Sequence, residues 1–210
     1  MLNRRELLIG SGLALLPLLA LASKSSDNAA AQRMRAFIES TPYARGRFSQ
    51  STLDRDGKPV SADSQGNFRF LRPGCFEWSI DKPYVQRIFS NGYTLWIYDP
   101  DLAQVTVRQI TGSDAISQSP AGLLFGTTEL DSIAELKLLD ADTVFAKFFN
   151  PSGNFESASV HFKGNELEEL TLKSSLGQTV RVRFLEFTRQ VQQAESFNFT
   201  PPAGTDILKM

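Results

Sequence analysis

The sequence predicts a mainly β protein with a few helices: an unclosed antiparallel β-barrel whose helices form a lid over a hydrophobic cavity. Three observations lead to this prediction. Strand-like runs recur about every ten residues, with turn residues between them. Helical patterns are confined to the start and the middle of the chain. Phenylalanine is abundant, at 16 of 210 residues, and would fill or line the concave side of a strongly curved sheet.

The first residues are typical of an export signal. Arg4 and Arg5 precede an apolar run, residues 7–22, which is shorter than the roughly 20 residues that span a bilayer and ends in small side chains. We therefore expect residues 1–22 to be a cleaved signal peptide, with a cut as late as residue 31 also compatible, and the protein to reside in the periplasm. Both the Sec and the twin-arginine routes fit the two arginines. Residues 23–33 are interpreted as a polar linker and residues 34–210 as a single domain.

A short helix opens that domain. Met34, Phe37 and Ile38 form one apolar stripe at helical spacing, and Pro42 ends the helix. Strand-like runs follow, with hairpin signals at the Asp-Gly pair 56–57 and the Asn-Gly pair 91–92. These runs are residues 45–53, 66–80 with a break near Pro73, 85–90, 93–99 and 103–110.

The middle of the chain interrupts this series with a second helical segment. It covers residues 119–126 and is followed by 131–136, and Leu123 and Leu124 are its predicted lid residues. Strands then resume at residues 143–150, 156–162, 169–175 and 179–187, and one more short strand is expected before the double proline at 201–202. Helices placed only at the start and in the middle would lie across one mouth of the curved sheet.

Groups suited to catalysis are sparse. The single histidine, His161, lies in an alternating run without a serine or cysteine placed to pair with it. The lone Cys75 is interpreted as a packed side chain, since no nearby base would activate it. No nucleotide-binding glycine motif is present. We therefore predict no enzymatic activity and no cofactor.

Metal and nucleic-acid binding are also not expected. Two acidic pairs occur in turn regions without the spacing of a calcium loop, so they are interpreted as solvated or capping residues. These pairs are Asp99 with Asp101 and Asp140 with Asp142. The formal net charge of −1, without a dense basic run, argues against nucleic acid as a partner.

The stretch 66–80 carries the most informative pattern. Phe68, Phe70, Phe76 and Trp78 would share one face because side chains alternate along each strand. Arg72 continues the register of the first two rings and would point to the same side. A desolvated guanidinium needs acceptors, and backbone carbonyls of a helical segment closing the mouth would supply them, so Arg72 would act as a latch. Two alternatives stay open: Arg72 extends to water at the strand end, and the rings form a solid core.

These residues resemble a known family. The run Gly66-Asn67-Phe68, the string Arg72-Pro73-Gly74-Cys75-Phe76-Glu77-Trp78 and the run from Leu95 to Pro100 are similar to the periplasmic outer-membrane lipoprotein carriers of the LolA family. Weaker landmarks of the same family are Phe48-Ser49-Gln50, Ser119-Pro120-Ala121 and Phe197 to Pro202. The similarity runs from about Met34 to Pro202.

The resemblance implies a carrier with a lid over an acyl-chain cavity. In that family the arginine that matches Arg72 bonds to lid backbone and keeps the empty cavity shut. Phe76 and Trp78 match positions that line or border the acyl site in that family. The full set of predicted cavity residues is Phe68, Phe70, Phe76, Trp78 and Trp96, and the predicted lid residues are Met34, Phe37, Ile38, Leu123 and Leu124.

The implied partners are acylated lipoproteins, an inner-membrane ABC transporter that releases them and an outer-membrane lipoprotein acceptor; a monomer is expected. Three alternatives remain open. The first is a related carrier for another lipid. The second is a structural or signalling module with a solid sheet core. The third is an enzyme on acylated substrates that would use His161 or the acidic pair Asp99 and Asp101.

Overall fold

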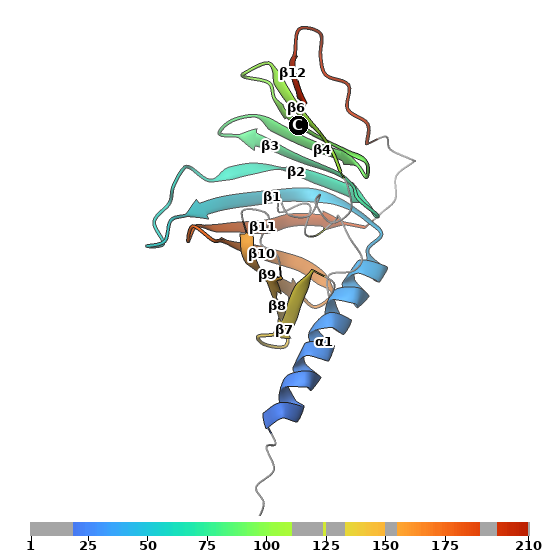
Figure 1. The fold of residues 1–210 in the computed structure, drawn as a ribbon, viewed down its shortest axis with the longest axis vertical. Coiled ribbons are helices and arrows are strands. Elements are labelled where there is room, and N and C mark those ends of the chain that lie inside the picture. The colour runs from blue at the N-terminus through green and yellow to red at the C-terminus, as the bar shows by residue number, and fades with distance from the viewer. Residues whose placement is uncertain (1–18, 111–123, 125–132, 150–154, 190–196, 210) are drawn as a thin grey trace, which may run out of the picture.

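The computed structural model describes residues 19–110, 124, 133–149, 155–189 and 197–209, with side chains from residue 29 onward. One helix, α1 (Leu19–Ser40), precedes a series of strands (Figure 1). The strands are β1 (Tyr43–Leu53), β2 (Ser64–Leu71), β3 (Cys75–Lys82), β4 (Gln86–Asn91), β5 (Thr94–Asp99), β6 (Gln104–Gln109), β7 (Ala134–Leu138), β8 (Thr143–Phe148), β9 (Phe155–Lys163), β10 (Glu166–Ser174), β11 (Thr179–Thr188) and β12 (Asp206–Lys209).

The strands form one 12-stranded sheet in the order β12-β6-β5-β4-β3-β2-β1-β11-β10-β9-β8-β7. Its edges are β12 and β7, and no pairing joins these two edges in the described part of the chain. The prediction of a mainly β fold with an unclosed sheet is thereby confirmed. The sheet departs from the expected antiparallel pattern at one place, because β12 pairs with β6 in parallel.

The C-terminal segment also differs from the prediction. The short strand lies after the double proline, as β12, rather than before it. The described residues before the prolines instead place a ring on the sheet: Phe199 stacks on Phe89 of β4, with 4.5 Å between ring centroids. Residues 197–200 therefore contact β4 and β5 through ring packing and form no strand of their own.

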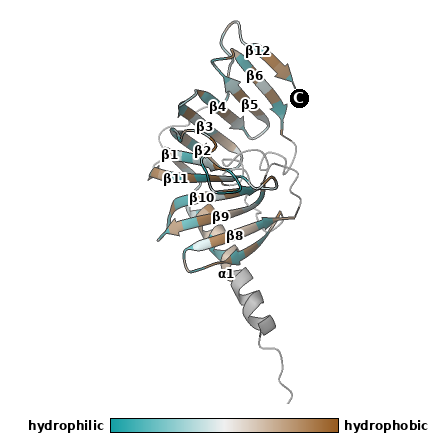
Figure 2. Ribbon diagram, turned by 90° about the vertical axis from the view of Figure 1, so that its left-hand side faces the viewer, coloured by the Kyte–Doolittle hydropathy of each residue, from teal (hydrophilic) through white to brown (hydrophobic). Residues whose placement is uncertain are grey.

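Local sequence signals account for the central hairpins. Gly92 adopts a φ of 87° in the turn between β4 and β5, which glycine does without steric cost. Along β2, and along β3 as far as Trp78, the burial of side chains alternates with period two, and Figure 2 shows bands of hydrophobic and hydrophilic residues along the strands. The break at Pro73 and Gly74 separates these two strands as predicted.

Two strand glycines permit the bending of the sheet near its centre. A Cβ atom on Gly46 would lie 1.8 Å from the carbonyl oxygen of Glu186, and one on Gly66 would lie 1.9 Å from that of Ser79. The β1–β11 and β2–β3 ladders each shift register close to these glycines. Such bulges bend a strand and increase its twist. The bend at this part of the sheet therefore requires glycine at positions 46 and 66.

Helix α1 begins earlier than predicted. It runs through residues 23–33, which the sequence suggested to be a polar linker, because no proline or glycine interrupts residues 19–40. No helix among the described residues is long and apolar enough to cross a membrane. The helix lies against β7 and β8, and the predicted stripe of Met34, Phe37 and Ile38 is buried.

The second predicted helical segment falls mostly outside the described residues. Residues 119–126, apart from Leu124, are not described. The stretch after them was expected to continue the interruption, but residues 134–136 belong to β7. Their burial explains this outcome, since Ala134 and Leu136 are buried while Glu135 between them is exposed, which is the period of a strand.

The sheet has two distinct faces. We call inner the face that carries the hydrophobic core and contacts α1, and outer the opposite face. The core is continuous from α1 across β1, β2 and β3 to β11, β10, β9 and β8. The outer face carries most of the charged side chains of the central strands, including Arg69 of β2 and Glu77 of β3.

Candidate functional site

Aromatic side chains gather on the inner face of β2 and β3. Phe68 lies opposite Trp78 in the ladder, and Phe70 lies opposite Phe76. All four are buried, at 2% exposure or less. The structure therefore brings together four of the five rings that the sequence suggested as cavity residues.

The cluster extends to rings that the sequence did not single out for this role. Phe48 of β1 stacks on Trp78 with a centroid distance of 3.8 Å, and Phe184 of β11 meets Phe68 edge-on at 5.3 Å. Phe187 also reaches Phe68, at 5.6 Å. Alternation along residues 180–184 would have placed Phe184 on this face. Phe187 breaks that alternation because the register of β1 and β11 shifts beside it.

Trp96 lies on the other side of the sheet. The ladders place it opposite Phe89 of β4, which lies opposite Glu77 of β3, so all three share the outer face. Trp96 is only partly buried. The structure thus does not bring this predicted cavity residue together with the other four.

Arg72 lies at the inner side, just beyond the end of β2. Its Nε donates a hydrogen bond of 3.1 Å to the carbonyl oxygen of Thr41, the residue after α1. Its guanidinium carbon is 5.1 Å from the ring centroid of Phe70 and 5.9 Å from that of Phe37. The cation is therefore held between the end of the helix and the aromatic face.

The guanidinium of Arg72 is only partly satisfied. Its two terminal nitrogens are buried, and neither has a hydrogen-bond partner in the described structure. Desolvation by burial lowers the pKa of Arg72 to about 10, well below the ordinary value of an arginine. A buried cation with free donors is costly, so this arginine is the group whose environment most suggests a functional role.

The predicted lid residues of α1 cover part of the inner face. Phe37 lies 5.2 Å from the ring of Phe162 in β9 and 6.3 Å from that of Phe187 in β11. Leu124 is also buried, whereas Leu123 lies outside the described residues. A lid over an open cavity stays a prediction, because most of the second lid segment is not described.

Two arginines fasten the end of α1 to the loops beside it. Arg33 forms an ion pair of 3.7 Å with Asp142 and also donates to the carbonyl oxygen of Gly164. Arg189 donates from Nε to the hydroxyl oxygen of Thr41 at 3.1 Å and from a terminal nitrogen to the carbonyl of Asn165. These polar contacts hold the helix at the edge of the aromatic face.

The candidate catalytic groups lie elsewhere. The Nδ1 atom of His161 is 2.9 Å from the hydroxyl of Thr143, and its Nε2 is 3.4 Å from a carboxylate oxygen of Glu168. Burial raises the pKa of the Cys75 thiol, which disfavours the thiolate. Neither side chain belongs to the aromatic cluster of the inner face.

One aspartate of each acidic pair accepts a backbone hydrogen bond within its own turn. Asp99 accepts a hydrogen bond from the backbone of Leu102 at 3.2 Å, and Asp140 accepts one from Asp142 at 2.8 Å. Asp101 is exposed. Within the described ranges, no group of three or more histidine, cysteine or acidic residues could hold a metal ion.

Comparison with known proteins concerns the family of the chain. The family model described as "Outer membrane lipoprotein carrier protein LolA" matches residues 39–200. The chain is 38% identical over 203 residues to the outer-membrane lipoprotein carrier protein of Bordetella pertussis, with 94% of this chain and 95% of the relative covered. It is 35% identical over 209 residues to the protein of the same name from Dechloromonas aromatica, with 97% and 96% covered.

A solved structure shares the fold at low identity. An uncharacterized conserved protein from Thermus thermophilus superposes with a TM-score of 0.54 at 11% identity, covering 86% of this chain and 99% of its own. This likeness concerns the backbone arrangement only.

Proposed function

The chain belongs to the family of outer membrane lipoprotein carrier proteins, LolA, and we propose on that basis that it carries lipoproteins by sheltering their acyl chains against the aromatic inner face of its sheet. The relatives with this name match almost the full length of the chain. The proposed carrier takes cargo from an inner-membrane ABC transporter and delivers it to an outer-membrane acceptor. It acts in the periplasm as a monomer, after removal of its N-terminal segment, and catalyses no reaction.

The observation that carries the proposal is the position of Arg72 beside the buried rings. An apolar face alone would suit an ordinary core. A cation held there by a hydrogen bond to the carbonyl oxygen of Thr41 and by the faces of two rings instead links the helix end to the aromatic face through contacts that are individually weak. Such a face can open for an apolar chain and close again after delivery.

The energetics of acyl transfer require this kind of balance. Burial of each CH₂ group contributes about 0.8 kcal/mol, so one chain of about 16 carbons contributes on the order of 12 kcal/mol. Passage through free water is therefore excluded on a biological timescale. A membrane or an acceptor offers nearly the same burial, so a carrier needs to bind only slightly less favourably than its acceptor to release the cargo.

Arg72 supplies a fastening of suitable strength for the empty state. Its hydrogen bond to Thr41 joins the end of α1 to the start of the turn after β2. A hydrogen bond that involves a charged group contributes about 1.5 to 3 kcal/mol. That is small compared with the burial of one acyl chain, so cargo can displace the contact. It is large enough to favour closure once the cargo has left.

Replacement of Arg72 by leucine tests the proposal. We expect the Arg72→Leu variant to load an acylated lipoprotein and to release it to acceptor vesicles at least several-fold more slowly than wild type, because its closed empty state has lost the fastening. Transfer of radiolabelled cargo to acceptor-containing vesicles measures this rate. Arg183→Leu is the matched control, since Arg183 lies exposed on β11, away from the inner face.

Two outcomes of this experiment separate the two parts of the proposal. Release from Arg72→Leu at the wild-type rate would refute the fastening role of Arg72. Failure of the wild-type protein to bind acylated cargo in preference to the same cargo without its lipid would refute the carrier function and favour a module with a solid core. Binding of another lipid in preference to acylated protein would indicate a related carrier.

A further inference from the structure

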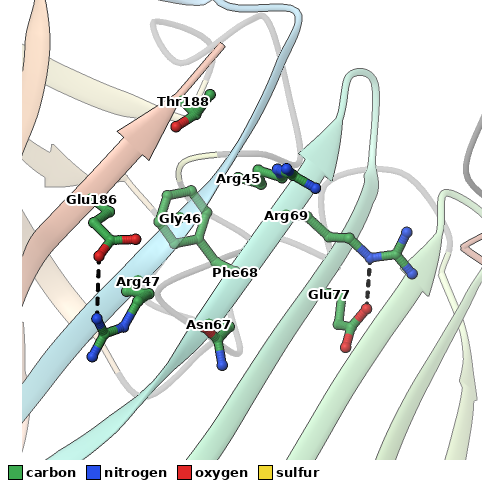
Figure 3. A pocket seen from close by; sticks show the side chains of 9 residues that line it. All are labelled: Arg45, Gly46, Arg47, Asn67, Phe68, Arg69, Glu77, Glu186 and Thr188. Atoms are coloured by element: carbon green, nitrogen blue, oxygen red, sulfur yellow. Dashed lines mark hydrogen bonds and ion pairs between the residues drawn. The ribbon is translucent and has the colours of Figure 1, made fainter. Parts of the chain in front are cut away.

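The outer face of the sheet contains a polar hollow of about 420 Å³. It lies on the side opposite the aromatic cluster, where β11, β1, β2 and β3 run next to each other (Figure 3). Its charged lining residues come from all four strands and are Arg45, Arg47, Arg69, Glu77 and Glu186, and the other lining residues are Gly46, Asn67, Phe68 and Thr188.

Two of its three arginines are already paired. Arg69 donates from Nε to Glu77 at 2.7 Å, and Arg47 donates to Glu186 at 3.1 Å. Figure 3 shows these two ion pairs on either side of the hollow. The side chain of Arg45 lies between them and has neither a hydrogen bond nor an ion pair with any described residue.

The position of Arg45 is unfavourable in the isolated protein. The β1–β2 ladder sets it directly opposite Arg69, and like charges that face each other across two strands are destabilising. Its neighbour on the other side is the uncharged Thr188 of β11. Packing does not require a cation here, because Arg45 is only partly buried.

Charge and size indicate what the hollow can hold. Three guanidinium groups against two carboxylates leave its lining with one positive charge. A guanidinium presents a fixed fork of donors that matches the oxygens of phosphate. Volumes of about 300 Å³ and above accept small organic ligands. The complement is thus a monoanionic phosphate ester rather than an isolated ion.

We propose that this hollow is a binding site for the phosphodiester of an anionic phospholipid headgroup, with Arg45 as its principal ligand, through which the outer face of the sheet touches a membrane surface. Arg47 and Glu186 form an accessible rim, with side-chain exposures of 56% and 59%. A headgroup that projects from a bilayer can therefore reach Arg45. This site is distinct from the proposed acyl-binding face, and the inference goes beyond the carrier function.

Vesicle binding tests the proposal. Purified protein is sedimented with vesicles of phosphatidylcholine alone or with added phosphatidylglycerol, at low salt, where surface electrostatics is least screened. We expect phosphatidylglycerol to increase the bound fraction and Arg45→Gln to reduce that increase at least threefold. Arg183→Gln removes the same charge from an exposed position outside the hollow and should leave binding within a factor of 1.5. Soluble glycerophosphoglycerol should compete with the vesicles for wild type.

Each other outcome overturns the proposal. Equal losses in the two variants would mean diffuse attraction of the whole surface to anionic lipid. Competition by the soluble diester without any vesicle binding would mean a site for free phosphate esters that no membrane reaches. Binding that ignores the soluble diester would exclude headgroup recognition. Circular dichroism melting should show that Arg45→Gln is at least as stable as wild type, since it removes a like-charge contact; a large loss of stability would show that Arg45 is structural.

Discussion

Two arginines only three positions apart, Arg69 in β2 and Arg72 just after it, meet opposite conditions on the two faces of the sheet. On the outer face, Arg69 has a carboxylate partner, Glu77, at 2.7 Å. At the inner face, Arg72 has one backbone carbonyl and the faces of two rings. Arg69 is thus neutralised by the residue opposite it on the outer face, whereas the charge of Arg72 is not balanced by a carboxylate among the described residues.

The tryptophans of the two faces differ in how deeply they are buried. Trp78 is 1% exposed and is enclosed by rings from β1, β2 and β11. Trp96, on the outer face, is only partly buried. The inner face therefore contributes most of the hydrophobic stabilisation, and the outer face is a surface on which polar and aromatic groups mix.

The largest effect is expected for truncation of the inner-face tryptophan. Trp78→Ala should reduce the free energy of unfolding by about 3 to 5 kcal/mol, because it removes a buried ring and leaves a cavity. Trp96→Ala is the matched control on the outer face and should cost much less. Urea denaturation measures both. A loss below about 1 kcal/mol for Trp78→Ala would indicate that the rings are loosely packed. It would contradict the conclusion that the inner face contributes most of the hydrophobic stabilisation.

The next largest effect is an increase in the free energy of unfolding, expected when the charge of Arg72 is removed. Burial lowers the pKa of Arg72 to about 10, so folding disfavours its charged form. That penalty to the free energy of unfolding is fully present below about pH 10 and is relieved only as the pH rises above that value. Removal of the cation by Arg72→Leu should therefore stabilise the protein near neutral pH, by about 1 to 3 kcal/mol, since apolar replacements of imperfectly paired buried charges often do so.

This gain should be constant between about pH 6 and 9, where the arginine stays charged in both states. Denaturant unfolding of wild type and Arg72→Leu at several pH values checks it. A destabilisation as large as that caused by breaking a buried salt bridge would show that Thr41 and the two rings fully compensate the charge. Arg72 would then be as well paired on the inner face as Arg69 is on the outer face.

The central hairpins could be predicted from the sequence, but the face of the sheet on which each side chain lies could not always be. Residues 66–80 alternate cleanly, so the common side of Phe68, Phe70, Phe76 and Trp78 followed from period two. The strand 94–99 is apolar at consecutive positions, Leu95 to Tyr98. Alternation therefore could not assign Trp96 to a face, and only its pairing with β4 does so.

Long-range contacts explain the other misses. The parallel pairing of β12 with β6 joins residues about one hundred positions apart, and no local signal reports such a contact. Phe187 joins the inner cluster only because a register shift precedes it in the β1–β11 ladder. The side-chain hydrogen bond of Arg72 that the described residues show goes to Thr41, 31 positions away. Residue types suggested that this arginine needs acceptors, but not which ones.

The smallest effect is expected for the outer-face ion pair. A double-mutant cycle with Arg69→Gln and Glu77→Gln should give a coupling free energy of about 0.5 to 1 kcal/mol, typical of partly exposed pairs, since both side chains are about one quarter exposed, at 25% and 24%. Urea unfolding at low and high salt measures it, and salt should reduce it. A weak coupling suits the proposed headgroup site, because Glu77 would then hold Arg69 only weakly when a phosphate approaches. The guanidinium carbon of Arg69 also lies 4.7 Å from the ring centroid of Phe197. A coupling above about 2 kcal/mol would hold Arg69 to Glu77, and Arg45 would then have to bind the anion without help from its neighbour across the ladder.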